Sequence, residues 1–211
     1  MRTYKLHVLR HGLTDTNISG IFYGSTDIPL HPEGRAELSA LLENYSYPYA
    51  EMVFSSPLIR ATETARILYP DTEIIELDGL RELSFGTYEG KSMSELSGDE
   101  QFSGFIAGKN DSLPNGVESP LDFYSRSVDA FISIVNMMMT SGVFSAAVIT
   151  HTGVIGNVLS GMAYPKAPPY EWNPSPGFGY TIVADPSLFL REPVFEVIDI
   201  IPKLIPEDEL Y

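Results

Sequence analysis

Short apolar runs, each bounded by polar or turn-forming residues, recur along the chain and predict buried β-strands. Four such runs occupy residues 5–9, 51–56, 72–77 and 145–150. Two more, "GYTIVAD" at 179–185 and "VFEVIDII" at 194–201, could form a closing hairpin or edge strands. Between the first four runs, apolar residues recur at helical spacing instead, so strands and helices alternate.

The strongest helical pattern lies at 119–139, where apolar residues recur on one face of the expected helix. Ser119 suits its N-cap and Pro120 its first turn. A second proline, Pro32, predicts another helix start at the head of "HPEGRAELSALLENY". The segment "GVIGNVLSGM" at 153–162 predicts a further helix.

Two shorter signals mark other helix starts. Ser56 followed by Pro57 has the N-cap and first-turn pattern, and it predicts a helix over "SPLIRATETARILY". Ser92 and Glu95 have the spacing of a capping box and predict a short helix.

Alternating strands and helices predict an α/β fold with a mostly parallel central sheet covered on both faces, a three-layer α/β/α sandwich. The stretches 98–118 and 163–177 contain many glycines and prolines, and we interpret them as insertions or loops over the rim of the sheet. At 211 residues and 44% hydrophobic content, the chain can bury a substantial core, and its length favours one domain over residues 1–211.

The composition limits the cellular compartments in which we expect the protein. The chain has no cysteine, which excludes disulfides and thiolate metal sites and fits a reducing compartment. Its first apolar segment is too short and too charged for a signal peptide, and no apolar run approaches the 20 or so residues of a membrane span. We therefore expect a soluble, cytoplasmic protein.

A formal net charge of −15 argues against nucleic acid and anionic membranes as partners. It does not exclude a small anionic ligand, because charges farther away than roughly 8 Å are screened at physiological salt. With only 13 Lys and Arg in the chain, the positions where they gather are informative.

Cationic and imidazole side chains follow three of the predicted strands. Arg10 and His11 come directly after the first, Arg60 lies just after the second, and His151 leaves the fourth. Ligands of open parallel sheets bind beyond the carboxyl ends of the strands, and helix N-termini there favour anions. The sequence therefore predicts a phosphate site. His7, inside a strand, and His31, beside a helix start, are assigned to no site.

Four blocks of sequence, together with the continuation of the first, resemble the histidine phosphatase superfamily, also called phosphoglycerate mutase-like. The matches run from residue 5 to about residue 160, in the family's order and approximate spacing. They are "LRHGLTDTN", "GSTDIPLHPEG", "SSPLIRATETA", "LRELSFGTYEG" and "THTG". The resemblance implies a phosphoglycerate mutase-like fold, with a small helical or loop insertion at about 92–118 over the active site.

The resemblance also implies a mechanism. His11 attacks phosphorus and becomes phosphohistidine, after which water or another acceptor takes the phosphoryl group. A neutral imidazole is needed, and the neighbouring Arg10 and Arg60 oppose its protonation while holding the phosphoryl oxygens. His151 is a further donor to those oxygens. Additional polar contacts with the phosphate are expected from Thr14, Asn17 and Thr152.

The resemblance makes Glu82 the acid that protonates the leaving alkoxide. Nearby arginines should lower the pKa of this carboxyl, which opposes that role, although a bound phosphate dianion could restore its protonation. The alternatives for Glu82 are a surface acid or a salt-bridge partner of Arg81. The scheme needs no metal and no cofactor, and the histidine spacing has none of the compact zinc patterns.

Two positions depart from the family pattern: Leu13 stands where an acid is frequent and Thr16 where an aromatic is common. The long basic segments that phosphoglycerate mutases use are not evident between residues 90 and 120. A mutase must retain its product until the phosphoryl group returns, so this weakly basic rim favours hydrolysis. A metal-independent phosphomonoesterase is thus preferred to a mutase, and a non-catalytic phospho-ligand binder is the third alternative.

Several aromatic residues lie where they could border the site, namely Phe102, Phe105, Tyr170 and Trp172. If they form an apolar rim, the substrate is a small phosphomonoester with some non-polar surface; alternatively they only pack the loops. The sequence selects no physiological substrate and does not distinguish a monomer from a homodimer.

Overall fold

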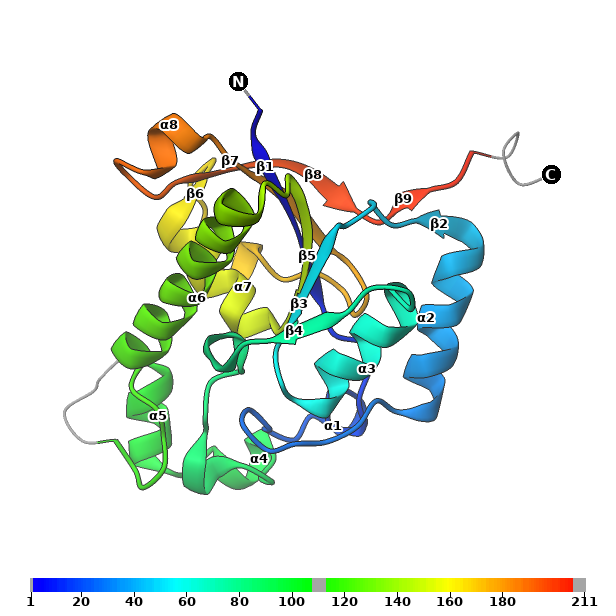
Figure 1. Ribbon diagram of the computed structural model, residues 1–211. Helices are drawn as coiled ribbons and strands as arrows, with labels where there is room; N and C mark the ends of the chain where they lie inside the picture. The colour runs from blue at the N-terminus through cyan, green and yellow to red at the C-terminus, as the bar shows by residue number, and fades with distance from the viewer. Residues whose placement is uncertain (1, 108–112, 207–211) are drawn as a thin grey trace.

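The computed structural model describes residues 2–107 and 113–206 of the chain. A seven-stranded sheet runs through its centre in the order β4-β3-β5-β1-β7-β8-β6 (Figure 1). β7 is antiparallel to its neighbours β1 and β8, whereas the other adjacent pairs are parallel. The strands are β1 (Tyr4–Arg10), β3 (Met52–Ser55), β4 (Ile74–Glu76), β5 (Ser145–Thr150), β6 (Ala163–Tyr164), β7 (Gly179–Ala184) and β8 (Phe195–Ile201); β2 (Tyr45–Ser46) and β9 (Lys203–Leu204) form a separate pair.

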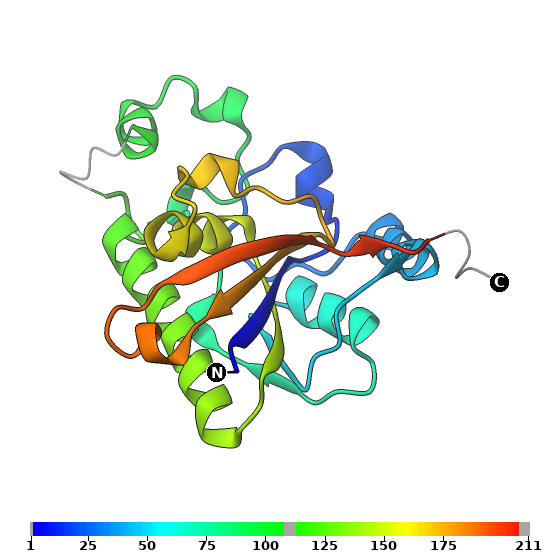
Figure 2. The ribbon, with the colours of Figure 1, turned by 90° about the horizontal axis from the view of Figure 1, so that it is seen from above.

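Helices cover both faces of the sheet, with α6 and α7 on one side and α2 and α3 on the other (Figures 1 and 2). The mostly parallel α/β/α fold predicted from the sequence is confirmed. The helices are α1 (Asp15–Ser19), α2 (Pro32–Asn44), α3 (Ile59–Leu68), α4 (Met93–Leu96), α5 (Glu100–Ile106), α6 (Pro120–Ser141), α7 (Thr152–Met162) and α8 (Pro186–Phe189), with 3-10 turns η1 (Asp78–Leu80), η2 (Gly86–Tyr88) and η3 (Pro169–Glu171).

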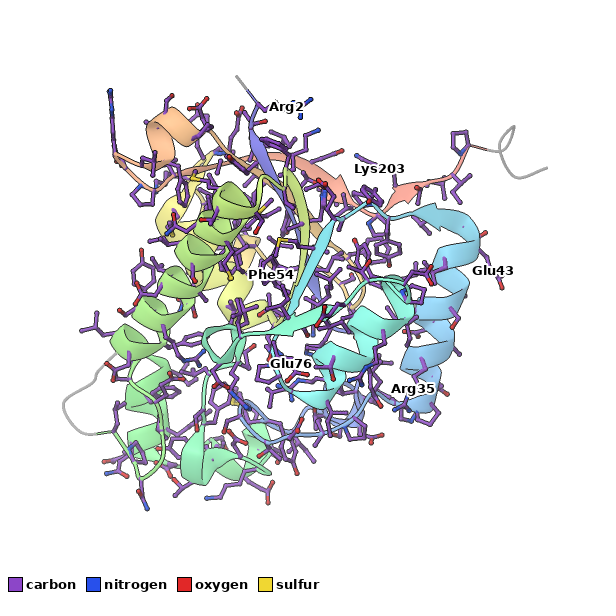
Figure 3. The ribbon with its side chains drawn as sticks, viewed as in Figure 1. Arg2, Arg35, Glu43, Phe54, Glu76 and Lys203 are labelled. Atoms are coloured by element: carbon purple, nitrogen blue, oxygen red, sulfur yellow. The ribbon has the colours of Figure 1, made fainter. Side chains whose placement is uncertain are left out.

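Alternating side chains of the strands supply the two halves of the core. On β1, Leu6 and Val8 pack beneath α6 and α7, while Leu9 packs beneath α2 and α3. Phe54 of β3 is fully buried, and Figure 3 places it in the interior, with Lys203 at the surface. Because parallel strands with both faces covered need apolar residues on both sides, they read as continuous apolar runs in the sequence.

Local capping and first-turn proline signals correctly predicted the starts of three helices, α2, α4 and α6. Ser119 accepts a hydrogen bond from the Asp122 backbone N–H at 3.0 Å and begins α6, with Pro120 in its first turn. Ser92 and Glu95 form the expected capping box of α4.

One expectation about local structure was wrong. Helix α3 begins at Ile59 with Leu58 as its N-cap, and not at Pro57 with Ser56 as the cap. The stretch 98–118, expected to belong to a helical or loop insertion, contains helix α5 together with loop. Residues 108–112 of the predicted insertion lie outside the described residues. None of the helices in the described part of the chain combines the length and apolar character needed to cross a membrane.

The carboxyl ends of the parallel strands meet at one end of the sheet. Arg10 of β1 pairs with Thr150 of β5, and Ile149 of β5 pairs with Ser55 of β3. In Figure 1 this end lies downward, toward α1 and the segment with α4 and α5. The residues that follow these strands are therefore neighbours in space.

Candidate active site

His11 is the first residue after β1, and two hydrogen bonds fix its position. Its backbone N–H donates to the Thr150 carbonyl at 3.0 Å, and its ring Nδ1 lies 2.7 Å from the Gly12 carbonyl. A carbonyl only accepts, so Nδ1 carries the proton and Nε2 keeps a free lone pair. The side chain is buried, so the fold holds an unprotonated ring nitrogen, Nε2, in an enclosed position.

Arg60 lies in the first turn of α3 with a nearly fully buried guanidinium group. Its two terminal nitrogens donate to the Gly24 carbonyl at 2.7 Å and to the Thr26 carbonyl at 3.0 Å. The Thr64 hydroxyl donates to the Arg60 carbonyl and accepts the Gly12 N–H at 2.9 Å. This hydroxyl thus ties the helix that carries Arg60 to the loop that carries the candidate nucleophile.

The loop that receives Arg60 is held in turn by Glu89. The Glu89 carboxylate accepts the backbone N–H groups of Ser25 and Thr26 at 2.9 and 2.8 Å, and also both of their hydroxyls. Burial acts to raise the pKa of Glu89, but these hydrogen bonds outweigh it and hold the pKa below its usual value. An ionised Glu89 therefore orients the loop whose carbonyl groups accept hydrogen bonds from Arg60.

His151 follows β5 and stands at the N-cap of α7. Its ring centroid is 5.1 Å from that of His11, so two residues 140 positions apart in the sequence share one site. Ring Nε2 lies 2.8 Å from the Ser56 hydroxyl, and ring Nδ1 is buried without a partner. The predicted gathering of the two imidazoles is present.

Buried polar atoms without partners lie at this same site. They include Arg10 Nε, His151 Nδ1 and Thr152 Oγ1. Another nitrogen of the Arg10 guanidinium donates to the Pro174 carbonyl at 3.0 Å. Buried polar groups in native proteins are almost always satisfied, so a group of unpaired ones requires an explanation. The unpaired Arg10 Nε and His151 Nδ1, the Thr152 hydroxyl next along the chain and the neighbouring Arg60 guanidinium group suit a bound oxyanion.

Glu82 reaches the site from the loop that follows η1. Its carboxylate accepts the Leu83 N–H at 2.8 Å and the Gly153 N–H at 3.0 Å. Burial raises the pKa of Glu82; the two backbone hydrogen bonds, Arg60 and Arg126 oppose this shift without overcoming it. The expected effect of nearby arginines is confirmed in sign, since Arg60 and Arg126 lower the pKa of Glu82, but desolvation is the larger effect and the net shift of the pKa is upward.

The alternative in which Glu82 pairs with Arg81 was also wrong. The Arg81 guanidinium instead contacts Asp78, with Nε to Oδ1 at 2.9 Å. Arg126 of α6 donates to the backbone carbonyls of Arg81 and Glu82 at 2.7 and 3.0 Å. These hydrogen bonds fix the main chain at Glu82 and so hold its buried carboxyl group in place.

Both histidines of the site are kept neutral. Burial lowers the pKa of His11 well below 6.5, and the positive charges of Arg60 and Arg10 lower it further, against the opposing Gly12 hydrogen bond. The pKa of His151 is lowered in the same way, first by burial and then by Arg60. Unprotonated imidazole is the form that can attack phosphorus.

Two polar residues of the first loop, Thr14 and Asn17, form a hydrogen bond with each other. Thr14 is buried, and its hydroxyl donates to the exposed Asn17 side chain at 2.8 Å at the start of α1. This pair closes the first turn of the helix. In the structure, the Thr14 and Asn17 side chains are therefore hydrogen-bonded to each other.

Most of the predicted aromatic rim is packed inside the protein. Phe102 and Phe105 are buried in a cluster around Tyr88. Trp172 is also buried, and its indole N–H donates to a backbone carbonyl at 3.3 Å. Only Tyr170 of the four is exposed, at 78%. An apolar rim formed by all four was therefore wrong, since three of them stabilise the loops that carry them.

Sequence reasoning missed three residues of the site: Ser56, Thr64 and Glu89. Ser56 and Thr64 lie in the "SSPLIRATETA" block and Glu89 in "LRELSFGTYEG". Their hydroxyl and carboxyl groups bond to partners distant in sequence, which no local pattern reveals. In residues 2–107 and 113–206, no three His, Cys, Asp or Glu side chains are grouped so as to hold a metal ion.

The chain is similar to known proteins over most of its length. A family model for the histidine phosphatase superfamily (branch 1) matches residues 6–175. The putative phosphoserine phosphatase 2 of Hydrogenobacter thermophilus is 29% identical over 163 residues, 71% of this chain and 79% of that protein. The 2,3-bisphosphoglycerate-dependent phosphoglycerate mutase 2 of Gloeobacter violaceus is 35% identical over 138 residues, 60% of this chain and 61% of that protein.

A solved structure extends the likeness to nearly the whole chain. The crystal structure of a putative alpha-ribazole-5'-P phosphatase from Escherichia coli superposes with a TM-score of 0.80 at 21% identity. The match covers 97% of this chain and 99% of that one, so the two proteins share a fold.

Proposed function

Because the chain belongs to the histidine phosphatase superfamily, as a phosphatase or a mutase, we propose that it hydrolyses a small phosphomonoester through a phosphohistidine on His11. One observation carries the proposal: two neutral imidazoles lie 5.1 Å apart, near the buried Arg60 and half-buried Arg10 guanidinium groups and unpaired polar atoms. The site has the charge and donors for PO₃ and a nucleophile aligned by its own backbone.

Substrate binding uses the cations of the site. Arg10 and Arg60 contact the phosphoryl oxygens, and their charge is worth more in a buried site than in water. His151 and Thr152 add neutral donors at the start of α7, whose N-terminal dipole also favours the anion. The same contacts stabilise the charge that spreads over the equatorial oxygens in the transition state.

The reaction then proceeds in two displacements. His11 Nε2 forms a bond to phosphorus while the bond to the ester oxygen breaks, and protonated Glu82 gives its proton to the leaving alkoxide. In the second step, water attacks phosphorus, the N–P bond breaks, and the Glu82 carboxylate takes the proton of the water. Inorganic phosphate leaves, and both residues return to their starting forms.

A mutase would share the first displacement but not the second. It must return the phosphoryl group to its bound product before water reaches it, so it needs cations around the site that retain a charged sugar acid. Between residues 90 and 120, the sequence contains only two cationic residues, Lys91 and Lys109. This weakly basic surround supports hydrolysis over isomerisation.

An aryl phosphate assay in excess chelator tests the proposal. Phosphate release that persists in chelator and is lost in His11→Ala supports a metal-independent phosphatase, with His31→Asn as a control that keeps an N-cap outside the site. Enzyme quenched in alkaline denaturant should carry phosphate on His11 that is stable in alkali and released by acid. Phosphoglycerate isomerisation faster than hydrolysis would overturn the proposal in favour of a mutase, and phosphate binding without turnover of any phosphomonoester would overturn it in favour of a binding protein.

A further inference from the structure

Ser56 occupies an unusual position for a serine at the end of a strand. It is fully buried, and its hydroxyl does not cap a helix in the way its sequence context predicts. The hydroxyl oxygen lies 2.8 Å from His151 Nε2. The backbone N–H of Leu58, at 3.4 Å, donates to the same oxygen.

Counting protons in this contact fixes the direction of the hydrogen bond. The Leu58 N–H uses one lone pair of the Ser56 oxygen, and the hydroxyl hydrogen still requires an acceptor. Among the hydrogen bonds of the described residues, His151 Nε2 is the acceptor within reach. The hydroxyl therefore donates, and Nε2 carries a lone pair.

The direction of this hydrogen bond also determines whether the second ring nitrogen, Nδ1, is protonated. A neutral imidazole has one N–H, so when Nε2 accepts, the proton must be on Nδ1. Nδ1 is the nitrogen that is buried without a partner in the oxyanion site. In the opposite tautomer, Nδ1 would present a lone pair to the phosphoryl oxygens and would repel them.

We propose that Ser56 is a positioning residue that holds His151 in the Nδ1–H tautomer, so that a neutral N–H donor points to the transferring phosphoryl group. The part that concerns phosphoryl transfer rests on the proposed function; the tautomer itself does not. His11 is held in the same tautomer by the Gly12 carbonyl, but there the product is a free Nε2 nucleophile. A carbonyl and a hydroxyl thus assign opposite roles to two neighbouring imidazoles.

Long-range ¹H–¹⁵N spectra of uniformly ¹⁵N-labelled protein test the proposal, because protonated and unprotonated ring nitrogens resonate far apart. The His151 signals are assigned by their loss in His151→Asn. We expect an unprotonated Nε2 in the wild type and in Ser56→Thr, and Nε2 protonation or tautomer averaging in Ser56→Ala. The matched control is Ser55→Ala, which removes a buried hydroxyl that bonds to a main-chain carbonyl only, and it should leave His151 unchanged.

Kinetics provide the second readout. Ser56→Ala should lower kcat/KM by about tenfold, the equivalent of one neutral hydrogen bond, and Ser56→Thr should restore most of it. A wild-type His151 protonated on Nε2, or a tautomer unchanged in Ser56→Ala, would overturn the proposal even if the enzyme is active. Spectra as expected in a protein that hydrolyses no phosphomonoester would overturn the proposed function while the role of Ser56 in selecting the tautomer stands.

Discussion

Gly153 gives the sharpest test of the role assigned to Glu82. A Cβ built on Gly153 would overlap the Glu82 Oε1 atom and would lie 2.9 Å from its Cδ. Carbon atoms pack at about 3.5–4.0 Å, so Gly153→Ala must displace the carboxyl group by about 1 Å. A misplacement of this size can cost about 10²-fold in rate, and we expect that loss in kcat/KM for an alkyl phosphate.

The leaving group separates an acid role from a general disturbance. An alkoxide needs a proton when the ester bond breaks, whereas nitrophenolate leaves without one. The loss in Gly153→Ala should therefore be several-fold smaller for a nitrophenyl phosphate. Folding should suffer little, because alanine is favoured over glycine in a helix by about 1 kcal/mol, which offsets part of the strain.

The assay compares kcat/KM for both esters, with melting temperature as the check on folding. Gly98→Ala is the matched control, since a Cβ there meets nothing within 4 Å. If Gly153→Ala keeps wild-type activity on the alkyl ester, or loses the same factor on both esters, Glu82 is not the proton donor and the assignment fails.

Three further predictions concern the surroundings of the site. Arg60→Ala should lower kcat/KM by about 10²–10³-fold on both esters, as for a lost oxyanion donor, and a loss under tenfold would remove Arg60 from contact with the phosphoryl group. Glu89→Gln should lower kcat/KM by about tenfold because the carbonyls that grip Arg60 lose their charged anchor, whereas Glu95→Gln, at an exposed cap, should have no effect. The pKa of His7 is lowered from 6.5 to about 4 by burial and then by Lys5. The unfolded chain therefore binds a proton first as pH falls, and His7 alone should lower the free energy of unfolding by about 3 kcal/mol between pH 6.5 and 4; urea unfolding should show a steeper fall in the wild type than in His7→Gln.

The sequence was sufficient for the features that local patterns determine. The N-cap of α6 at Ser119 and its first-turn Pro120 were predicted because capping depends on residues within one turn. The meeting of His11 and His151 was predicted for a different reason: parallel strands end at the same edge, and each histidine directly follows a strand. Topology brings together what lies far apart in the chain.

Ser56 shows why other features were missed. A serine before a proline at a helix start has the local pattern of a cap, yet its hydroxyl bonds to an imidazole 95 residues later in the chain. Phe102 and Phe105 were misplaced for the same reason, because an aromatic residue in a loop is exposed or buried according to what packs on it. In each case a tertiary partner decided between two structures that the local sequence allows equally.

The charge state of Glu82 was the feature of the site that was hardest to predict from the sequence. It also shows how burial acts on the site as a unit. Charges can be counted along a sequence, so the arginines were visible and their effect on the pKa of Glu82 had the correct sign. Desolvation depends on the finished fold, and it outweighs them. The same enclosure acts on His11 in the opposite direction, because burial opposes a positive imidazolium as it opposes a negative carboxylate. One buried site thus keeps His11 without a proton and raises the affinity of Glu82 for one, the pair of states that the proposed first displacement requires.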